Sequence, residues 1–373
     1  MALDFTFTDE HEELRATIRA FLAEHSDEAA VRVQMAGERG HDPEVWALLA
    51  EQLGLAGLIV PEVHGGAGMG YVELLVAMEE MGRALLCAPY LGTSVFATNA
   101  LLTCADASTQ KDLLAKIAAG RAIVSVAHAE PNGRWDVAGI AMRARAKGDG
   151  FELDGTKSWV LDGHVADTLL VAARTEDGAL ELFRVDARAE GLSRTLVPTL
   201  DTTRKLATVE LAATPAQKVS SGDQTASFER VLALTACALA AEQAGGAQRC
   251  LEMATDFAKT RLQFGRPIGS YQAIKHKCAD MLVVVEFAKS AAYAACFAAA
   301  NDAPDLLEAA ALAKAYCSEA YFKVAAENIQ VHGGMGFTWE HPAHLYFKRA
   351  KASDLLFGDA AHHRERLAEQ LGI

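Results

Sequence analysis

The first residues that could do chemistry lie in a polar break between two long helical patterns, AKTRLQFGRPIGSYQAIKHKCADM, from Ala258 to Met281. Glycine and proline end the first helical pattern there and allow the second to begin. Arg261, Gln263 and Phe264 therefore project from a helix end, and Gln272 opens the next helix. A guanidinium beside an aromatic ring suits a ligand that carries a phosphate and a planar ring system. A helical hairpin with a charged corner fits the break alone equally well.

A second glycine-rich segment, QVHGGMGF, runs from Gln330 to Phe337 after another helical pattern. Its paired glycines place a turn where the backbone can approach a ligand closely. Together, the two segments resemble the acyl-CoA dehydrogenase family, in which TR.QFG.PI and Q.HGG.G segments bind FAD, mostly the FAD of a neighbouring subunit. The resemblance implies that FAD is bound by the following side chains and glycines: Arg261, Gln263, Phe264, Gln272, Gln330, Gly333 and Gly334.

The same resemblance implies a reaction. Acyl-CoA dehydrogenases remove the α-proton of a CoA thioester with a glutamate while the β-hydride passes to the flavin. The family carries this glutamate at one of two places, which correspond here to Phe357, after the segment Lys348–Lys351, and to Thr235, on the helix before Arg261. Neither residue can act as a base. Asp359 is the fallback base, although its shorter side chain is displaced by two residues from the first place.

Between the helical patterns, residues 122–219 change to alternation with a period of two, which is typical of strands. We expect strands at 123–127, 168–173, 180–185 and 208–211, and a hairpin whose turn is Asp154-Gly155. No βαβ pattern accompanies them.

In the family, a β-domain of this kind covers the flavin ring with a T-E-P-G-x-G-S-D loop and a W-(I/V)-(T/S) strand. Residues 129–136 and 159–161 stand at these places. The resemblance implies that Trp159 contacts the ring and that Ala129 serves it through its backbone. Ala129, Trp135 and Leu161 replace hydroxyl residues of the family, so side-chain hydrogen bonds to the cofactor are missing.

The fold class that follows is mainly α with an inserted β-domain, similar to acyl-CoA dehydrogenases. We expect an N-terminal helical domain over 1–121, a middle β-domain over 122–222, and a C-terminal four-helix bundle over 223–373. With 373 residues, of which 51% are hydrophobic, the chain is long enough for two or three domains with large cores.

The composition of the chain limits the classes of partner that it can bind. Lys and Arg number 35 against 49 Asp and Glu, and this net charge of -14 argues against nucleic acid or an anionic membrane as the main partner. The seven cysteines are scattered without CxxC spacing, and no ligand set for a metal stands out. Without a signal peptide or a recognisable 18-residue apolar run, we expect a soluble cytoplasmic protein.

Residues that would reach a neighbour's FAD are kept, whereas those that would serve this chain's own flavin ring and base are replaced. This asymmetry predicts an acyl-CoA dehydrogenase subunit paired with a homologous, catalytically complete subunit, as in heteromeric enzymes of actinobacteria that oxidise steroid side chains. The implied partners are an acyl-CoA substrate and an electron acceptor such as electron-transfer flavoprotein. Two alternatives stay open: an independently active homo-oligomer that uses another base, and a non-enzymatic assembly protein that has lost FAD.

Overall fold

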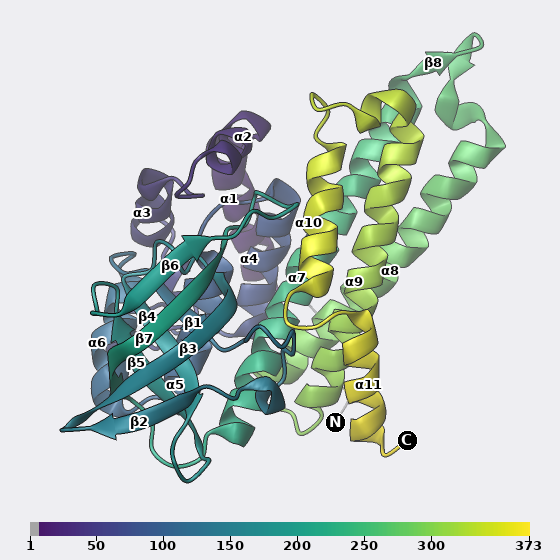
Figure 1. The fold of residues 1–373 in the computed structure, drawn as a ribbon. Coiled ribbons are helices and arrows are strands. Elements are labelled where there is room, and N and C mark those ends of the chain that lie inside the picture. The colour runs from purple at the N-terminus through teal and green to yellow at the C-terminus, as the bar shows by residue number, and fades with distance from the viewer. Residues whose placement is uncertain (1–6) are drawn as a thin grey trace. The chain divides into compact units, whose positions relative to one another are not determined.

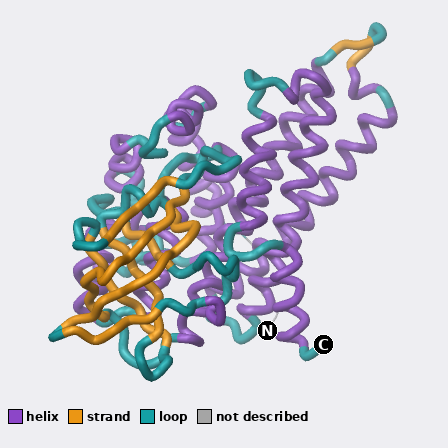
Figure 2. The backbone as a smooth tube through the Cα atoms, in the orientation of Figure 1, coloured by secondary structure: helices purple, strands orange, loops and turns teal. Residues whose placement is uncertain are grey.

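Residues 7–373 are described in the computed structural model of the chain, and their order of elements is helical, then β, then helical again (Figure 1, Figure 2). This order confirms the expected architecture. Backbone contacts divide the described residues into two compact units, one formed by 7–32, 71–86 and 236–373, the other by 33–70 and 87–235. The N-terminal helices are α1 (Asp9–His25), α2 (Glu28–Ala36), α3 (Pro43–Glu51), α4 (Tyr71–Ala84), the π-helix η3 (Tyr90–Ala97), α5 (Thr98–Cys104) and α6 (Ala107–Ala118).

The second unit, residues 33–70 and 87–235, is built on one seven-stranded sheet and is called the β-unit below. β4 pairs with β5 in addition to its other neighbours, so that the order of paired strands closes on itself. This order is β1-β4-β2-β3-β7-β5, with β6 paired to β7. β1 and β4 run parallel, but the chain between them passes through the short 3-10 helix η4 (Val137–Gly139), β2 and β3, and not through an α-helix. The strands are β1 (Val124–Ala127), β2 (Arg143–Lys147), β3 (Gly150–Leu161), β4 (Thr168–Arg174), β5 (Leu180–Asp186), β6 (Leu192–Leu196) and β7 (Leu206–Lys218).

The hairpin expected at Asp154-Gly155 was wrong. These residues lie inside the continuous strand β3, where its register against β7 shifts between Leu153 and Gly155. Gly155 has φ +134°, which a glycine supplies at a bulge without steric cost. The actual turn is Gly148-Asp149 between β2 and β3, since Lys147 pairs with Gly150 across it.

The C-terminal helices are α7 (Thr225–Thr260), α8 (Gln272–Ala300), α9 (Leu306–His332), α10 (Ala343–Leu355) and α11 (Ala360–Leu371). Both α10 and α11 pack against α9, and Figure 1 shows them one after the other along it. The fourth position of the expected bundle is therefore filled by two shorter helices, with a break at 356–359. α7 and α9 are joined by a hydrogen bond from Gln243 Nε2 to Ser318 Oγ, 3.0 Å long.

α4 and α7 cross so closely that the crossing requires glycine on both helices. A Cβ atom on Gly82 would lie 2.0 Å from the carbonyl oxygen of Glu242, and one on Gly245 would lie 2.0 Å from that of Glu79. Both separations are far below a possible contact distance. The glycines thus fix the position of α4 against α7.

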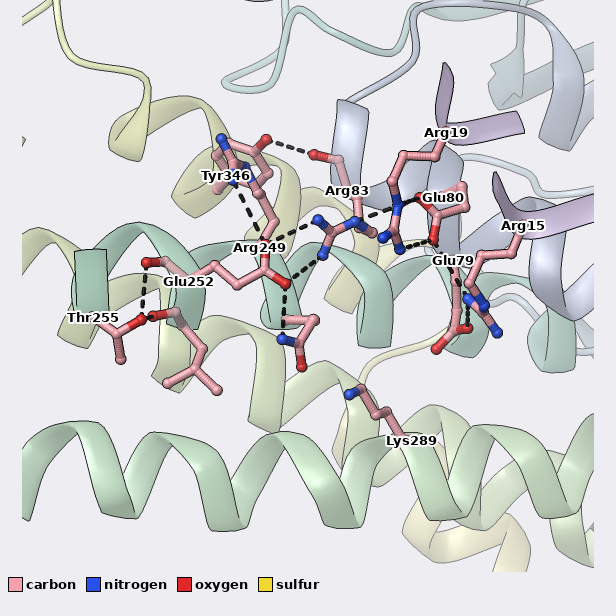
Figure 3. Close-up of polar contacts among 12 residues, drawn as sticks. Arg15, Arg19, Glu79, Glu80, Arg83, Arg249, Glu252, Thr255, Lys289 and Tyr346 are labelled. Carbon is pink, nitrogen blue, oxygen red and sulfur yellow. Dashed lines mark hydrogen bonds and ion pairs between the residues drawn. The ribbon is translucent and has the colours of Figure 1, made fainter. Parts of the chain in front are cut away.

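Arginine–glutamate pairs join α1, α4 and α7 around this crossing (Figure 3). Glu79 and Glu80 are almost fully buried, so their charges need partners. Burial raises the pKa of Glu252, but hydrogen bonds from Arg83 and Gln248 and the charges of Arg83 and Arg249 together outweigh burial and lower this pKa to about 2. The pairs are Arg15–Glu79 at 2.6 Å, Arg19–Glu80 at 2.6 and 2.8 Å, and Arg83–Glu252 at 2.8 and 2.9 Å.

Candidate functional site

The polar break between α7 and α8 folds as a two-residue β-hairpin. Its strands are β8 (Leu262–Gln263) and β9 (Arg266–Pro267), and its turn is Phe264-Gly265. Both turn residues have positive φ, +52° and +79°, as the type I′ turn of a two-residue hairpin requires. This turn presents the Phe264 ring to solvent, with 92% of the residue exposed. Sequence reasoning had located the turn but not its hairpin.

The second glycine segment lies next to the end of α7. The rings of Phe257 and His332 are 4.3 Å apart, so the last turn of α7 and the last turn of α9 are neighbours. Gly333, with φ +60°, and Gly334 follow immediately in η6 (Gly333–Phe337), and a Cβ atom on either would meet open space. The two sequence motifs therefore lie at the same end of the helical bundle, shown in Figure 1.

Several donors at this end of the bundle are uncommitted. Arg261, Gln272 and Gln330 are exposed, and among residues 7–373 their side chains have no hydrogen-bond or ion-pair partner. Gln263 uses its amide nitrogen only for the adjacent carbonyl of Leu262, at 2.8 Å. A guanidinium and two amides beside an exposed aromatic ring and two open glycines form a surface suited to a phosphate-bearing aromatic ligand. The residues fit the FAD that the sequence suggested.

In the β-unit, the structure brings Ala129 and Trp159 together. The amide of Ser158 donates to the carbonyl of Ala129 at 2.9 Å, which joins the segment after β1 to β3. Ala129 is buried, whereas Trp159 is 42% exposed and has φ +57°. The register of β3 against β7 shifts again between Lys157 and Val160, and this irregularity contains Trp159. Bulges of this kind turn a side chain away from its regular place in a sheet.

A buried ion pair holds these two segments. Lys157 is fully buried, and its Nζ donates to Glu130 Oε1 at 2.8 Å and to the carbonyl of His128 at 3.0 Å. Desolvation lowers the pKa of Lys157 to about 8, although the Glu130 carboxylate opposes the shift. The same oxygen of Glu130 accepts the amides of Ala141 and Met142. Sequence reasoning missed this pair; a lysine between Leu153 and Val160 in a buried strand was the available signal.

At the first family position for a base, Phe357 is buried and lies in the break between α10 and α11 with φ +61°. Its carbonyl accepts a hydrogen bond from His363 Nε2 at 3.0 Å. Desolvation, and secondarily Lys314, lower the pKa of His363 to about 3, so its imidazole is neutral. Lys314, fully buried on α9, donates to the carbonyls of Asp354 and Gly358 at 2.9 and 3.0 Å.

The other two candidate base positions are committed to helix backbone. The Asp359 carboxylate accepts the amide of His362 at 2.9 Å and is the N-cap of α11. Thr235 is fully buried in α7, and its hydroxyl donates to the carbonyl of Val231 at 2.8 Å. Asp359 therefore uses one carboxylate oxygen as a helix cap, and Thr235 has no group that could act as a base.

The segment before the break also differs from the family. Arg349 belongs to the segment Lys348–Lys351, which corresponds to R-D-A-K in the family, so an arginine stands where the family has an aspartate, and it is almost fully buried. Its Nη1 donates to Glu242 Oε1 on α7 at 2.9 Å, and the Glu242 side chain is 5% exposed. A buried ion pair thus joins α10 to α7.

One long helix carries an apolar face that residues 7–373 leave open. Leu282, Val283 and Phe287 of α8 are 48%, 55% and 61% exposed, and Phe287 packs edge-on against Tyr316 of α9. α8 is long and apolar enough to span a membrane by length and composition, contrary to our expectation that no such run exists. Half of its most apolar window is buried, and a single such helix also occurs in cores of other proteins, so the match is weak support for a membrane span.

Three family models match the chain in sequence order. "Acyl-CoA dehydrogenase, N-terminal domain" matches residues 8–121, "Acyl-CoA dehydrogenase, middle domain" matches 125–214, and "Acyl-CoA dehydrogenase, C-terminal domain" matches 225–372.

Individual proteins are similar over nearly the whole chain. Acyl-CoA dehydrogenase IpdE2 of Mycobacterium tuberculosis is 36% identical over 97% of this chain and 98% of the relative. Among solved structures, a Tcur3481-Tcur3483 steroid ACAD variant is 33% identical with a TM-score of 0.89, over 98% of both chains. The ChsE4-ChsE5 complex of M. tuberculosis contains a chain that is 29% identical with a TM-score of 0.90, over 99% of both chains.

Proposed function

The chain belongs to the acyl-CoA dehydrogenase family, and on that premise we propose that it is the subunit without a catalytic base in a hetero-oligomeric, FAD-dependent acyl-CoA dehydrogenase. The enzyme would dehydrogenate a CoA thioester between its α- and β-carbons in fatty-acid or steroid side-chain β-oxidation. A thioester of a steroid-derived acid is the favoured substrate class, because a similar solved structure is titled a steroid enzyme.

One contrast carries the proposal. At the end of the bundle, Arg261 and Gln330 offer exposed donors that residues 7–373 leave without partners. At the family's base position, Phe357 is a buried aromatic side chain with no acid–base chemistry. A chain that has exposed ligand-binding side chains but no catalytic base of its own is suited to completing the active site of another subunit.

Bound FAD would supply the two-electron oxidation. This chain's residues would hold it: Arg261 would pair with the pyrophosphate, Phe264 would pack on a ring, and Gly333 and Gly334 would allow the backbone to approach. Their exposure leaves them accessible to a ligand that a neighbouring subunit shares. In the β-unit, Trp159 remains as an aromatic surface, but Ala129 and Leu161 offer no side-chain hydrogen bond.

The open face of α8 supports oligomerisation with a homologous chain. Leu282, Val283 and Phe287 would lose their exposure in a helix-to-helix interface. The ChsE4-ChsE5 complex, which contains a similar chain, is a precedent for such an assembly. An acceptor such as electron-transfer flavoprotein would reoxidise the cofactor. The cysteines of residues 7–373 are all free thiols, which fits a reducing cytoplasm.

The alternatives find less support. A homo-oligomer that uses Asp359 as base would have to release its carboxylate from the N-terminus of α11. A protein that has lost FAD would have no need of the uncommitted donors at Arg261 and Gln330.

Replacement of Arg261 by Ala in the assembled hetero-oligomer tests the proposal. Loss of charge-assisted hydrogen bonds of about 1.5 to 3 kcal/mol weakens FAD retention roughly tenfold or more. Arg266→Ala is the matched control, because Arg266 lies in the same hairpin as Arg261 but its guanidinium already stacks on the ring of Tyr271, 4.0 Å from the ring centroid. Equal flavin content in the Arg261→Ala and wild-type oligomers would refute the role of Arg261.

A further inference from the structure

Seven non-glycine residues within 7–373 have positive φ, and three of them are bulky aromatic residues at candidate site positions: Trp159, Phe264 and Phe357. This conformation costs a bulky residue about 1 to 3 kcal/mol, so the surrounding structure must impose it. The turn geometry of β8 and β9 accounts for Phe264. Trp159 lies in no such turn, whereas Phe357 is the third residue of a turn that is closed by the amide of Gly358 on the carbonyl of Leu355 at 3.3 Å. Fully buried lysines contact both segments: Lys157 is two residues before Trp159, and Lys314 binds the carbonyl of Gly358.

We propose that Lys157 and Lys314 are positioning residues that hold Trp159 and Phe357 in the left-handed backbone conformation, and that they thereby set the direction of both aromatic side chains. The placement of these aromatic residues in an active site rests on the proposed function, whereas the backbone role does not.

Lys157 fixes both sides of the irregularity that contains Trp159. Its Nζ ties β3 to the carbonyl of His128 and the carboxylate of Glu130, and the next residue, Ser158, ties β3 to Ala129. β3 is therefore held against 128–130 immediately before the register shifts. The strand regains its pairing only at Val160, so Trp159 takes up the mismatch and its ring stays partly in solvent.

Lys314 does the same for Phe357 from α9. Its Nζ lies within hydrogen-bond distance of three acceptors, Ser318 Oγ at 3.0 Å and the carbonyls of Asp354 and Gly358. The carbonyl of Asp354 lies in the last turn of α10, and Gly358 directly follows Phe357. His363 binds the carbonyl of Phe357 itself. The backbone is thus fixed on both sides of Phe357 independently of the side chain at 357.

A lysine that merely fills buried space would stabilise the fold to the same extent whichever residue it neighbours. A positioning lysine is coupled to the strained residue. Glycine adopts positive φ without strain. When the lysine is removed, an aromatic residue relaxes and recovers its strain, whereas a glycine has none to recover. Loss of the lysine is therefore expected to lower Tm more in the glycine background than in the wild type.

Two thermal-unfolding cycles on the full chain test this coupling: Lys157→Met with and without Trp159→Gly, and Lys314→Met with and without Phe357→Gly. We expect the Tm decrease caused by each lysine substitution to be larger by roughly 2 to 10 °C in the glycine background. Equal decreases in both backgrounds would overturn the positioning role. Lys147→Met and Lys351→Met are the controls, because the side chains of these lysines are themselves 68% and 43% exposed, and both variants are expected to show no coupling.

Acrylamide quenching of Trp159 fluorescence, taken as the difference from the Trp159→Phe chain, provides a second readout. Lys157→Met is expected to change this quenching, and Lys147→Met is not. Unchanged quenching in folded Lys157→Met would contradict the proposal for this site. If Lys157→Met or Lys314→Met does not fold, Glu130→Gln and Ser318→Ala weaken the same contacts more mildly and replace them in the cycles.

Discussion

Replacing Arg349 by Met should destabilise the helical unit strongly, since it leaves the Glu242 carboxylate buried without its guanidinium partner. The two side chains are 3% and 5% exposed and lie 2.9 Å apart. Breaking a pair buried to this extent costs about 3 to 5 kcal/mol. For a unit of this size, that corresponds to a decrease in Tm of roughly 6 to 20 °C. Urea unfolding followed by circular dichroism measures the loss directly.

The matched control is Arg364→Met, which breaks an ion pair with Glu319 of similar length, 2.6 Å, whose side chains are 54% and 59% exposed. Exposed pairs contribute about 0 to 1 kcal/mol, so this variant should unfold almost as the wild type does. The double variant Glu242→Leu with Arg349→Met should recover most of the stability, because no buried charge remains. Equal losses for Arg349→Met and Arg364→Met would refute the reasoning.

Three further predictions concern stability. Desolvation lowers the pKa of Lys314 to about 7, so between pH 7 and 10 the folded lysine is neutral while the unfolded one stays protonated. The unfolding free energy of the wild type relative to Lys314→Met should then rise by about 1 kcal/mol per pH unit. A difference in unfolding free energy that stays constant in urea unfolding from pH 6 to 9 would contradict this shift. Tyr90 is buried with no partner for its hydroxyl in the described structure, so Tyr90→Phe should leave Tm unchanged or raise it, whereas Tyr346→Phe, which loses a 2.6 Å bond to the Arg83 carbonyl, should lower stability by about 1 kcal/mol. Gly82→Ala should cost roughly 3 kcal/mol or more because its Cβ would overlap the Glu242 carbonyl, while Gly334→Ala, in open space, should not change the Tm of the chain; a small loss for Gly82→Ala would show that the crossing can shift.

Sequence patterns predicted the parts of the fold that depend on periodicity. The change from helical spacing to alternation and back gave the order of the architecture, and the glycine and proline break before Gln272 gave the turn between α7 and α8. β2 and β6 were not expected, because β2 is RARAK, with four of its five residues exposed, and β6 is a five-residue strand without a buried residue. Local composition cannot reveal strands whose apolar partners lie elsewhere in the chain.

The misplaced hairpin shows the same limit. Asp154-Gly155 has the residues of a two-residue turn, but Gly155 uses its freedom for a bulge within β3. The buried lysines were also missed, because burial of Lys157 and Lys314 depends on acceptors that the fold supplies from distant segments, such as the Gly358 carbonyl. Family resemblance gave the positions of Phe357 and Asp359, and the structure added that Asp359 is an N-cap.

The central claim is that this chain cannot dehydrogenate a thioester alone and completes a homologous subunit. The most direct measurement is turnover of straight-chain and steroid acyl-CoAs with an electron acceptor, by the pure chain and by the chain co-purified with a homologue. Absence of a positioned base removes about 10²- to 10⁴-fold in rate, so we expect negligible turnover by the pure chain, even with FAD supplied, and robust turnover by the pair. Robust turnover by the pure chain, abolished by Asp359→Asn, would contradict the account and make Asp359 the base.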